Sequence, residues 1–584
     1  MKLRKYLILS AIYFTVAMIL IWFFVMRPTG PFGPPLTQAE LKQVTPDWSK
    51  ATDNNWSPWY TLPDGTIEWN PAASYNAWLA TIPEADKAWP GITWNMEQFK
   101  RQEYDLYQTD NLRNNEFGTL PNEPAKWSRI ETLLASPISD ELLEGFKEAL
   151  AKPVLGCVLS TTHGPYEHAA IVEFDDDFDP GPLDFDPQAN LSLADSFQPW
   201  FSTLSSVSRF LVSKGAHELQ AGNPDAFVEI VELMFNSAHH AAALPTLIGQ
   251  LFEFAIQDRS MALMSWGIEH HRDQLTEEHL QTFEQLLAQP NNFQVRWQGE
   301  AMVFHDSIRR LTNKHGVLDN PTLAQTSPFQ LELADPINTP DDQLDPSMQR
   351  VLMVYNKILQ TIEPTSTLPW DQSATTAQEI LDEHDWELAE QAKRHLKLFV
   401  PALDQVAGAI RARSQRALGL RTAIAAHRAK LRHGQFPSSI ESIQIHDPDL
   451  MPFDPIDAFT NQHLRYDILG PGTPDDPNTM PVIYSLGHDR TDNAATPAYS
   501  VVLMDKLVIN EATGQKEIIE VEVRTVLAPE WIRSTLLEPA SPQVLGKVSG
   551  DWILFPIPMD DPKPRDFDYN DLTGEYEWIE DTDW

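Results

Sequence analysis

Two histidines near a run of aspartates are the first residues whose types and spacing could do chemistry. His163 and His168 flank a turn, and three consecutive aspartates begin at Asp175, after the apolar stretch 169–174. Imidazole nitrogens and carboxylate oxygens both bind transition metals. The same pattern also fits a solvated loop beside a strand formed by residues 169–174, so a metal site and a plain surface loop stay open as alternatives.

The aspartates continue into a carboxylate-rich loop, residues 175–186, which reads DDDFDPGPLDFD. Calcium takes several oxygen ligands from loops of this kind. The spacing does not match the EF-hand loop, because the glycine and the terminal glutamate are missing at the required offsets. An acidic loop exposed to water is the alternative that the composition favours.

Other motifs that carry a known mechanism are absent from the sequence. It contains no phosphate-binding P-loop, no glycine-rich dinucleotide fingerprint, no H-E-x-x-H zinc motif and no G-x-S-x-G nucleophile elbow. His239 is followed by His240, and His270 by His271, in segments of helical periodicity. Neighbouring side chains on a helix point about 100° apart. Neither pair is therefore expected to chelate one ion, and these histidines are predicted to be exposed or structural.

The charge balance excludes several classes of partner and site. Lys and Arg total 43 against 83 Asp and Glu, which gives a net charge of -40. A protein that binds a nucleic-acid backbone needs surplus basic residues to displace counterions, so no nucleic-acid partner is expected. Cys157 is the only cysteine, which rules out an intrachain disulfide, a cysteine-based zinc cage and an iron–sulfur cluster.

The first residues predict a membrane anchor. Residues 6–26 form an almost entirely apolar run of 21 residues, and about 20 apolar residues span the hydrocarbon core of a bilayer. The run is longer than the apolar part of a signal peptide, and it ends in bulky residues rather than at a cleavage site. Lys2, Arg4 and Lys5 precede it. The positive-inside rule therefore predicts a single-pass protein with a cytoplasmic N-terminus and its body in the periplasm or at the cell surface.

A segment rich in proline and tryptophan, residues 28–130, is predicted to follow as a stalk or irregular segment. Ten prolines occur between positions 28 and 90, and proline fixes φ and removes a hydrogen-bond donor. Tryptophans in this stretch could stack on sugar rings or lie at the membrane interface. The alternative is that the indoles attach the segment to the helical body by burying apolar area.

Helical periodicity dominates the middle of the chain, residues 131–400. Apolar residues recur at three-to-four spacing in residues 201–211 and 227–235, and the breaker Gly222-Asn223-Pro224-Asp225 separates the two runs. Further amphipathic helices are predicted for residues 244–256, 275–287 and 293–311. Short loops between helices favour antiparallel hairpins, so a repeat-like array of helical hairpins is expected. Such arrays usually present a surface for binding.

The most specific motif lies between residues 402 and 508. A long helical run, 406–431, leads into HGQFP at positions 433–437. Asp454-Pro455 and the stretch DAFTNQHLRY at 457–466 follow, and YSLGHD at 484–489 ends the motif. Gly434 is expected to end the helix. Tyr466 and Tyr484 are expected to lie on neighbouring short strands.

This order resembles the C-terminal half of the major pseudopilin of type II secretion systems. In that family a helix, a G-x-Y/F-P turn, a D-P-W/F-G element and a final S-x-G-x-D loop follow one another. The chain also resembles a group of bacterial membrane-anchored proteins that carry the same tail behind a long helical domain, over residues 202–508. Ala458 stands where the family has proline or tryptophan, and Asn461 where it has glycine. Residues 1–25 lack the glycine and the acidic residue of a prepilin leader, so the chain is not expected to be a pseudopilin itself.

The resemblance implies a calcium site. In pseudopilins the loop after S-x-G holds calcium through carbonyl groups and aspartates. Asp489 matches the family's aspartate, and Asp492 is the second candidate ligand. The pair of glycines that the family carries after this aspartate is absent. The alternative is a turn that is closed by aspartate hydrogen bonds alone.

The C-terminal part of the chain predicts a hairpin and an acidic tail. Residues 501–509 and 517–527 read as two strands, which complete a small α+β module, 401–530. The remaining segment, 531–584, is predicted to be an acidic aromatic tail. Between positions 560 and 584 it carries ten acidic and two basic residues with five aromatics. This composition is typical of disorder, and the aromatics would also suit a docking segment.

Together these patterns predict a mainly α protein. It has a transmembrane helix (1–27), a helical-hairpin array and a small C-terminal α+β module of pseudopilin-like type. The expected function is that of a membrane-tethered, extracytoplasmic binding or scaffold protein of the bacterial cell envelope, with an envelope protein or a glycan as partner. The alternative is an envelope hydrolase that uses carboxylates and His163 or His168. A concave helical face would favour binding, and a pocket with converging histidines and carboxylates would favour the enzyme.

Overall fold

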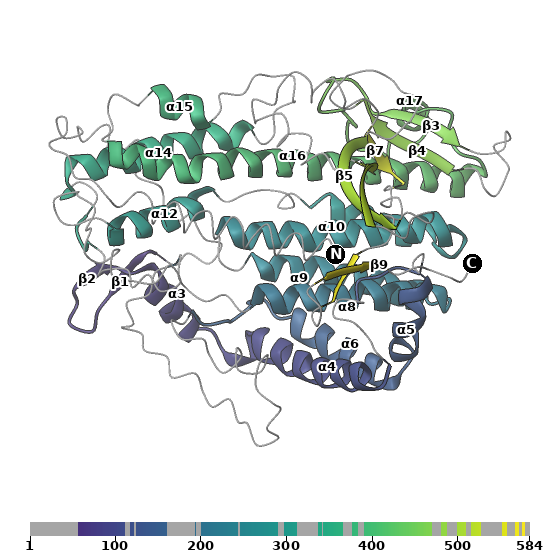
Figure 1. The fold of residues 1–584 in the computed structure, drawn as a ribbon, viewed down its shortest axis with the longest axis horizontal. Coiled ribbons are helices and arrows are strands. Elements are labelled where there is room, and N and C mark those ends of the chain that lie inside the picture. The colour runs from purple at the N-terminus through teal and green to yellow at the C-terminus, as the bar shows by residue number, and fades with distance from the viewer. Residues whose placement is uncertain are drawn as a thin grey trace. The chain divides into compact units, whose positions relative to one another are not determined.

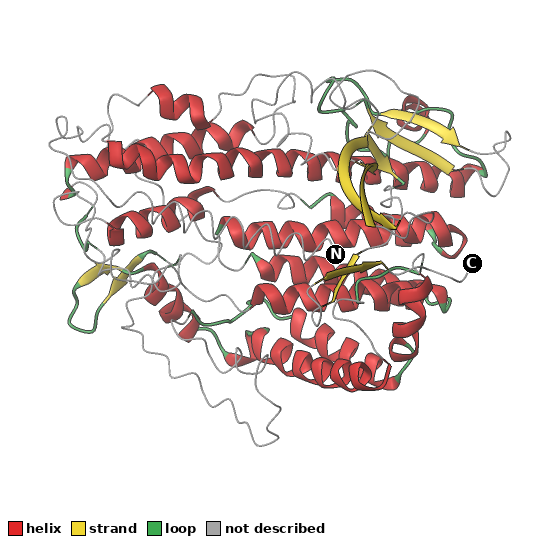
Figure 2. Cartoon of the chain, in the orientation of Figure 1, coloured by secondary structure: helices red, strands yellow, loops and turns green. Residues whose placement is uncertain are grey.

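Helices dominate the described part of the chain. The structure, a computed structural model, describes residues 57–110, 117–121, 124–159, 193, 200–242, 246–289, 297–311, 337–340, 343–365, 377–383, 390–469, 480–486, 499–509, 516–526, 552–556, 567–570 and 575–578. Helices account for 68% of these residues, which confirms the predicted mainly helical class (Figures 1 and 2).

The chain divides into two compact units. Unit 1 comprises Met1–Leu368 and Ser373–Arg413, and unit 2 comprises Pro369–Gln372 and Ser414–Trp584. The predicted anchor, residues 1–27, lies outside the described residues. Within the described ranges, no helix combines the length and the apolar character that crossing a bilayer requires.

Regular structure begins early in the segment that was predicted to be an irregular stalk. Strands β1 (Trp59–Thr61) and β2 (Ile67–Trp69) form an antiparallel hairpin. Helices α3 (Pro71–Ala80) and α4 (Trp89–Asp110) follow it. The expectation of an extended segment is therefore corrected for residues 59–110.

The prolines of this segment start helices instead of breaking them. Pro71 lies in the first turn of α3 and Pro90 in the first turn of α4, where a missing N–H costs no helical hydrogen bond. Asn70 caps α3, because its side chain accepts a hydrogen bond of 3.0 Å from the Ala73 amide. Trp69 and Trp89 are buried, as expected if indoles attach this segment to the body.

Helices α5 (Pro124–Leu134) and α6 (Pro137–Leu150) come next, and α6 packs closely on α4. A Cβ atom added to Gly91 would lie 2.9 Å from the Cβ of Ala149, and one added to Gly145 would overlap the carboxamide of Asn95. Glycine at these two positions therefore sets the short distance between the helices.

Four helices form the centre of unit 1. They are α8 (Trp200–Gln220), α9 (Pro224–Ala241), α10 (Leu247–His271) and α11 (Glu277–Leu287), and the first three lie side by side (Figure 1). Gly222 adopts φ +85° between α8 and α9, a conformation that favours glycine. The predicted helical hairpin with its breaker at Gly222 is thus confirmed.

Three further helices and part of a fourth belong to unit 1. They are α12 (Trp297–Leu311), α14 (Pro346–Thr365), α15 (Ala377–Glu383) and the first part of α16 (Glu390–His433). Phe304 on α12 stacks on Tyr355 of α14 with 3.6 Å between ring centroids. This aromatic pair lies in the buried contact between the two helices.

Unit 2 combines the end of α16, the short helix α17 (Ile440–His446) and a three-stranded antiparallel sheet of order β3-β4-β7. The strands are β3 (Arg465–Leu469), β4 (Met480–Ser485) and β7 (Trp552–Phe555). Tyr466 pairs with Ile483, and Tyr484 with Arg465, so the prediction of neighbouring strands is confirmed. Strand β7 lies in the segment that was predicted to be a tail, which is a correction.

Two separate hairpins complete the described strands. Strands β5 (Tyr499–Ile509) and β6 (Lys516–Val526) pair antiparallel along their whole length, as predicted. Strands β8 (Phe567–Asn570) and β9 (Glu575–Trp578) also pair, although the acidic composition predicted disorder there. Aromatic residues at alternate positions, as in FDYN and EYEW, favour strands in spite of the acidic neighbours.

Candidate functional site

The residues that the sequence predicts to do chemistry lie outside the described part of the structure. They are His163 and His168, the loop 175–186, and the candidate calcium ligands Asp489 and Asp492. Within the described ranges, no three or more His, Cys, Asp or Glu side chains are placed to hold a metal ion. The charged side chains that the described residues bury are therefore the remaining candidates.

In unit 2 the side chain of Asp457 joins two parts of the C-terminal motif. Its Oδ1 accepts hydrogen bonds from the Phe459 amide at 2.9 Å and from Ser485 Oγ at 2.7 Å. Its Oδ2 accepts from Thr460 Oγ1 and from the Leu486 amide, both at 3.2 Å. Asp457 is only 1% exposed. This carboxylate therefore fixes the residues directly before the loop that carries Asp489.

The turn after Asp457 contains a residue with positive φ. Asn461 adopts φ +56°, in the left-handed region where glycine is favoured and asparagine is the usual substitute. Asparagine therefore suits the conformation of this turn. Gly434 likewise adopts φ +82° directly after α16, which confirms that it ends the helix.

Two histidines of unit 2, His433 and His463, contact carboxylates from other segments of the unit. His433 Nε2 lies 2.8 Å from Asp447 Oδ2. His463 bridges two groups, with Nδ1 3.3 Å from Glu441 Oε1 and Nε2 2.8 Å from Asp454 Oδ1. The two ring nitrogens point in opposite directions, so these carboxylates do not converge on one ion.

In unit 1 the deepest charged pair belongs to α12. Asp306 and Arg310 are fully buried, and Arg310 Nε donates to Asp306 Oδ1 at 3.0 Å. The same carboxylate accepts from the indole Nε1 of Trp69 at 3.1 Å and from the Leu193 amide at 2.9 Å. A buried carboxylate with one cation and two further donors is well compensated for the loss of water.

Arg309 holds the β1–β2 hairpin and a distant segment against α12. Its guanidinium donates to the carbonyl oxygens of Ile337 and Thr339, at 2.6 and 2.8 Å. It also lies over the rings of Trp69 and Trp59, 4.6 and 5.5 Å from the ring centroids. Cation–π contact of this kind strengthens when water is excluded. The hairpin that follows the predicted stalk is thus fixed to α12 by arginine and tryptophan.

Glu300 is a buried carboxyl group where α10, α12 and α14 meet. Its Oε2 accepts a hydrogen bond of 3.0 Å from the Leu247 amide, at the start of α10. The hydroxyl of Tyr355 also acts on this carboxyl group. Burial raises the pKa of Glu300, and the Leu247 amide and the Tyr355 hydroxyl oppose this effect. Burial also raises the pKa of Tyr355 well above its usual value.

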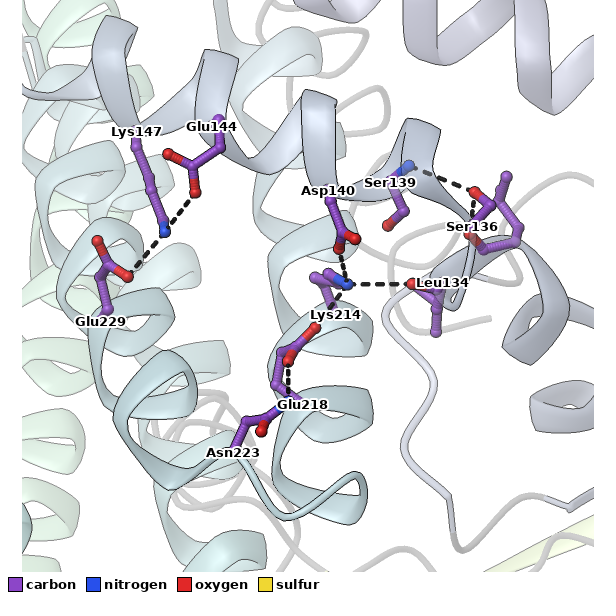
Figure 3. A network of polar contacts seen from close by, with 11 residues as sticks. Leu134, Ser136, Ser139, Asp140, Glu144, Lys147, Lys214, Glu218, Asn223 and Glu229 are labelled. Atoms are coloured by element: carbon purple, nitrogen blue, oxygen red, sulfur yellow. Dashed lines mark hydrogen bonds and ion pairs between the residues drawn. The ribbon is translucent and has the colours of Figure 1, made fainter.

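A lysine network connects α5, α6 and α8, and Figure 3 shows it. Lys214 is almost fully buried, and its Nζ lies 2.7 Å from Asp140 Oδ1 and 2.6 Å from Glu218 Oε1. It also donates to the Leu134 carbonyl at 3.1 Å. Glu218 in turn accepts from Asn223 at 2.9 Å, so the network reaches the turn before α9.

One histidine of the pair His239 and His240 is buried and the other is exposed. His240 is buried, and its Nε2 lies 3.3 Å from the carbonyl of Leu150 at the end of α6. Burial lowers the pKa of His240 to about 4, so the ring is neutral at physiological pH. His239 is exposed. The two neighbouring side chains therefore lie in different environments.

The oxygen atoms of the buried carboxylates Asp306 and Asp457 accept hydrogen bonds from other parts of the chain. A general acid or base must reach a substrate proton, whereas Asp306 and Asp457 are enclosed by their protein donors. The sequence did not predict that the charged side chains of α12, Asp306 and Arg310, are buried. The only sequence signal is the spacing of Asp306 and Arg310, which is equally typical of exposed helix pairs.

Comparisons with known proteins add no family to this description. No protein-family model, curated protein or solved structure matches the chain.

Proposed function

We propose that the chain is a membrane-tethered, extracytoplasmic binding or scaffold protein of the bacterial cell envelope. The observation that carries the proposal is the stack of antiparallel helices α8 to α11. Helix α9 packs against α6, α8, α10 and α11 and exposes one stripe of side chains: Asp225, Glu229, Glu232, Asn236 and His239. Stacked helical hairpins commonly bind partners along such surfaces.

Attachment of the β1–β2 hairpin to α12 supports a scaffold role. The β1–β2 hairpin is the first described structure after the predicted anchor and stalk. Trp69 binds Asp306 through its indole and lies under Arg309, and its amide donates to Asn338 Oδ1 at 2.8 Å. These contacts join the hairpin to unit 1 through both the backbone and the buried ring of Trp69.

We further propose that unit 2 contains a module of pseudopilin-like type. Supporting observations are the end of α16 on a three-stranded antiparallel sheet, Asn461 in a conformation suited to the family's glycine, and Asp457 between the two motif segments. The proposed calcium ligands Asp489 and Asp492 follow β4 by a few residues. Calcium uses backbone carbonyl groups and carboxylates of this kind.

A topology experiment tests the tether. The full-length chain is expected to stay in the membrane after high-salt and carbonate washing, and protease added from outside is expected to degrade the body. The reason is the apolar run 6–26 with its basic N-terminal flank. Release of a shortened chain that begins after Met26 would show a cleaved signal peptide instead.

A crosslinking experiment tests the binding surface. A photoreactive amino acid at Asn236, in the exposed stripe of α9, is expected to capture one discrete envelope partner in living cells. The matched control is the same probe at Thr132, an exposed polar residue of α5. If both positions give the same products, or neither gives any, α9 does not bind the partner.

A further inference from the structure

We draw no further inference here: the strongest candidate, the row of carboxylates Asp225, Glu229 and Glu232 on the exposed face of α9, belongs to the surface already proposed to bind a partner, and nothing in the described part of the chain shows what covers it.

Discussion

Ser485 Oγ donates a hydrogen bond of 2.7 Å to Asp457 Oδ1. The two residues belong to different segments of the C-terminal motif, and Ser485 is the last residue of β4. The Leu486 amide binds the other oxygen of the same carboxylate. Asp457 thus links the turn before β3 to the end of β4.

Asp457→Ala is expected to destabilise unit 2 by about 3 kcal/mol or more, because buried donors are left without their acceptor. Asp457→Asn is expected to cost less, since the amide keeps one acceptor oxygen. Hydrogen-exchange protection of the β4 amides measures the effect. Asp449→Asn, at an exposed carboxylate that binds Arg432, is the control and is expected to cost under about 1 kcal/mol. Equal losses for Asp457→Ala and Asp449→Asn would contradict the role of Asp457.

Calcium is expected to raise the melting temperature of the full-length chain, and Asp489→Ala is expected to reduce the rise. A ligand that binds only the folded state stabilises it by mass action. The charge of -40 attracts calcium everywhere, so the Asp449→Ala variant is the matched control for screening. If both variants lose the same part of the calcium response, the response is general electrostatics and the site is not at Asp489.

The helical part of the fold was predictable because its signals are local. Gly222 and Pro224 separate α8 from α9, and Gly434 ends α16, as their backbone preferences require. The prediction of an irregular stalk was wrong for residues 59–110, because it relied on composition. Proline content suggests an extended chain, but Pro71 and Pro90 occupy first turns, and composition carries no information about position within a helix.

Long-range features were not predictable from the sequence. The WILF segment of β7 is too short to define a strand by periodicity, and its partner strand is distant in the chain. The charges of α12 have the spacing of surface pairs, and only packing against Trp69 shows that Asp306 is buried. Of the candidate sites, the motif around Asp457 is supported by geometry, whereas Asp489, Asp492, His163 and His168 stay predictions.

Gly145→Ala is expected to destabilise unit 1 by about 1 kcal/mol, because the Asn95 carboxamide must move and lose its hydrogen bond with the Gly91 carbonyl. The new methyl group would overlap the side chain of Asn95 on α4. Asn95→Ala in the same chain is expected to remove most of this loss. A double-mutant cycle on urea unfolding measures the coupling between the two positions. Additive losses would mean that α4 and α6 do not meet at this pair.

Protonation of His240 is expected to destabilise unit 1 in acid. The pKa of the folded state is about 4, against 6.5 for an ordinary histidine. Between these values the unfolded chain binds more protons, so stability rises with pH across this window and falls on acidification. At roughly 1.4 kcal/mol per pKa unit, the loss is on the order of 3 kcal/mol.

His240→Gln tests this linkage, because glutamine is uncharged and keeps a donor for the Leu150 carbonyl. The variant is expected to show a flatter stability profile between pH 4 and 6.5, measured by unfolding at several pH values. His239→Gln, at the exposed neighbour, is expected to leave the slope unchanged. If both variants change the slope equally, His240 is not the group responsible.

Glu300 is expected to have the opposite effect on stability as the pH rises. Burial raises its pKa above the ordinary value of 4.5, so above pH 4.5 the folded chain holds a proton that the unfolded chain has lost. Stability therefore falls as pH rises from 4.5 through the folded pKa. Glu300→Gln removes this titration, keeps an acceptor for the Leu247 amide and offers an amide donor to Tyr355. It is expected to match or exceed the wild-type stability at neutral pH and to lose the downward slope.

Glu300→Ala removes the acceptor as well, so it is expected to cost about 1–3 kcal/mol at every pH. His240 acts in the opposite direction over the same pH window, so the Glu300→Gln variant is compared with the wild type at each pH. If the difference in stability between Glu300→Gln and the wild type is the same at pH 4.5 and at neutral pH, another group causes the slope.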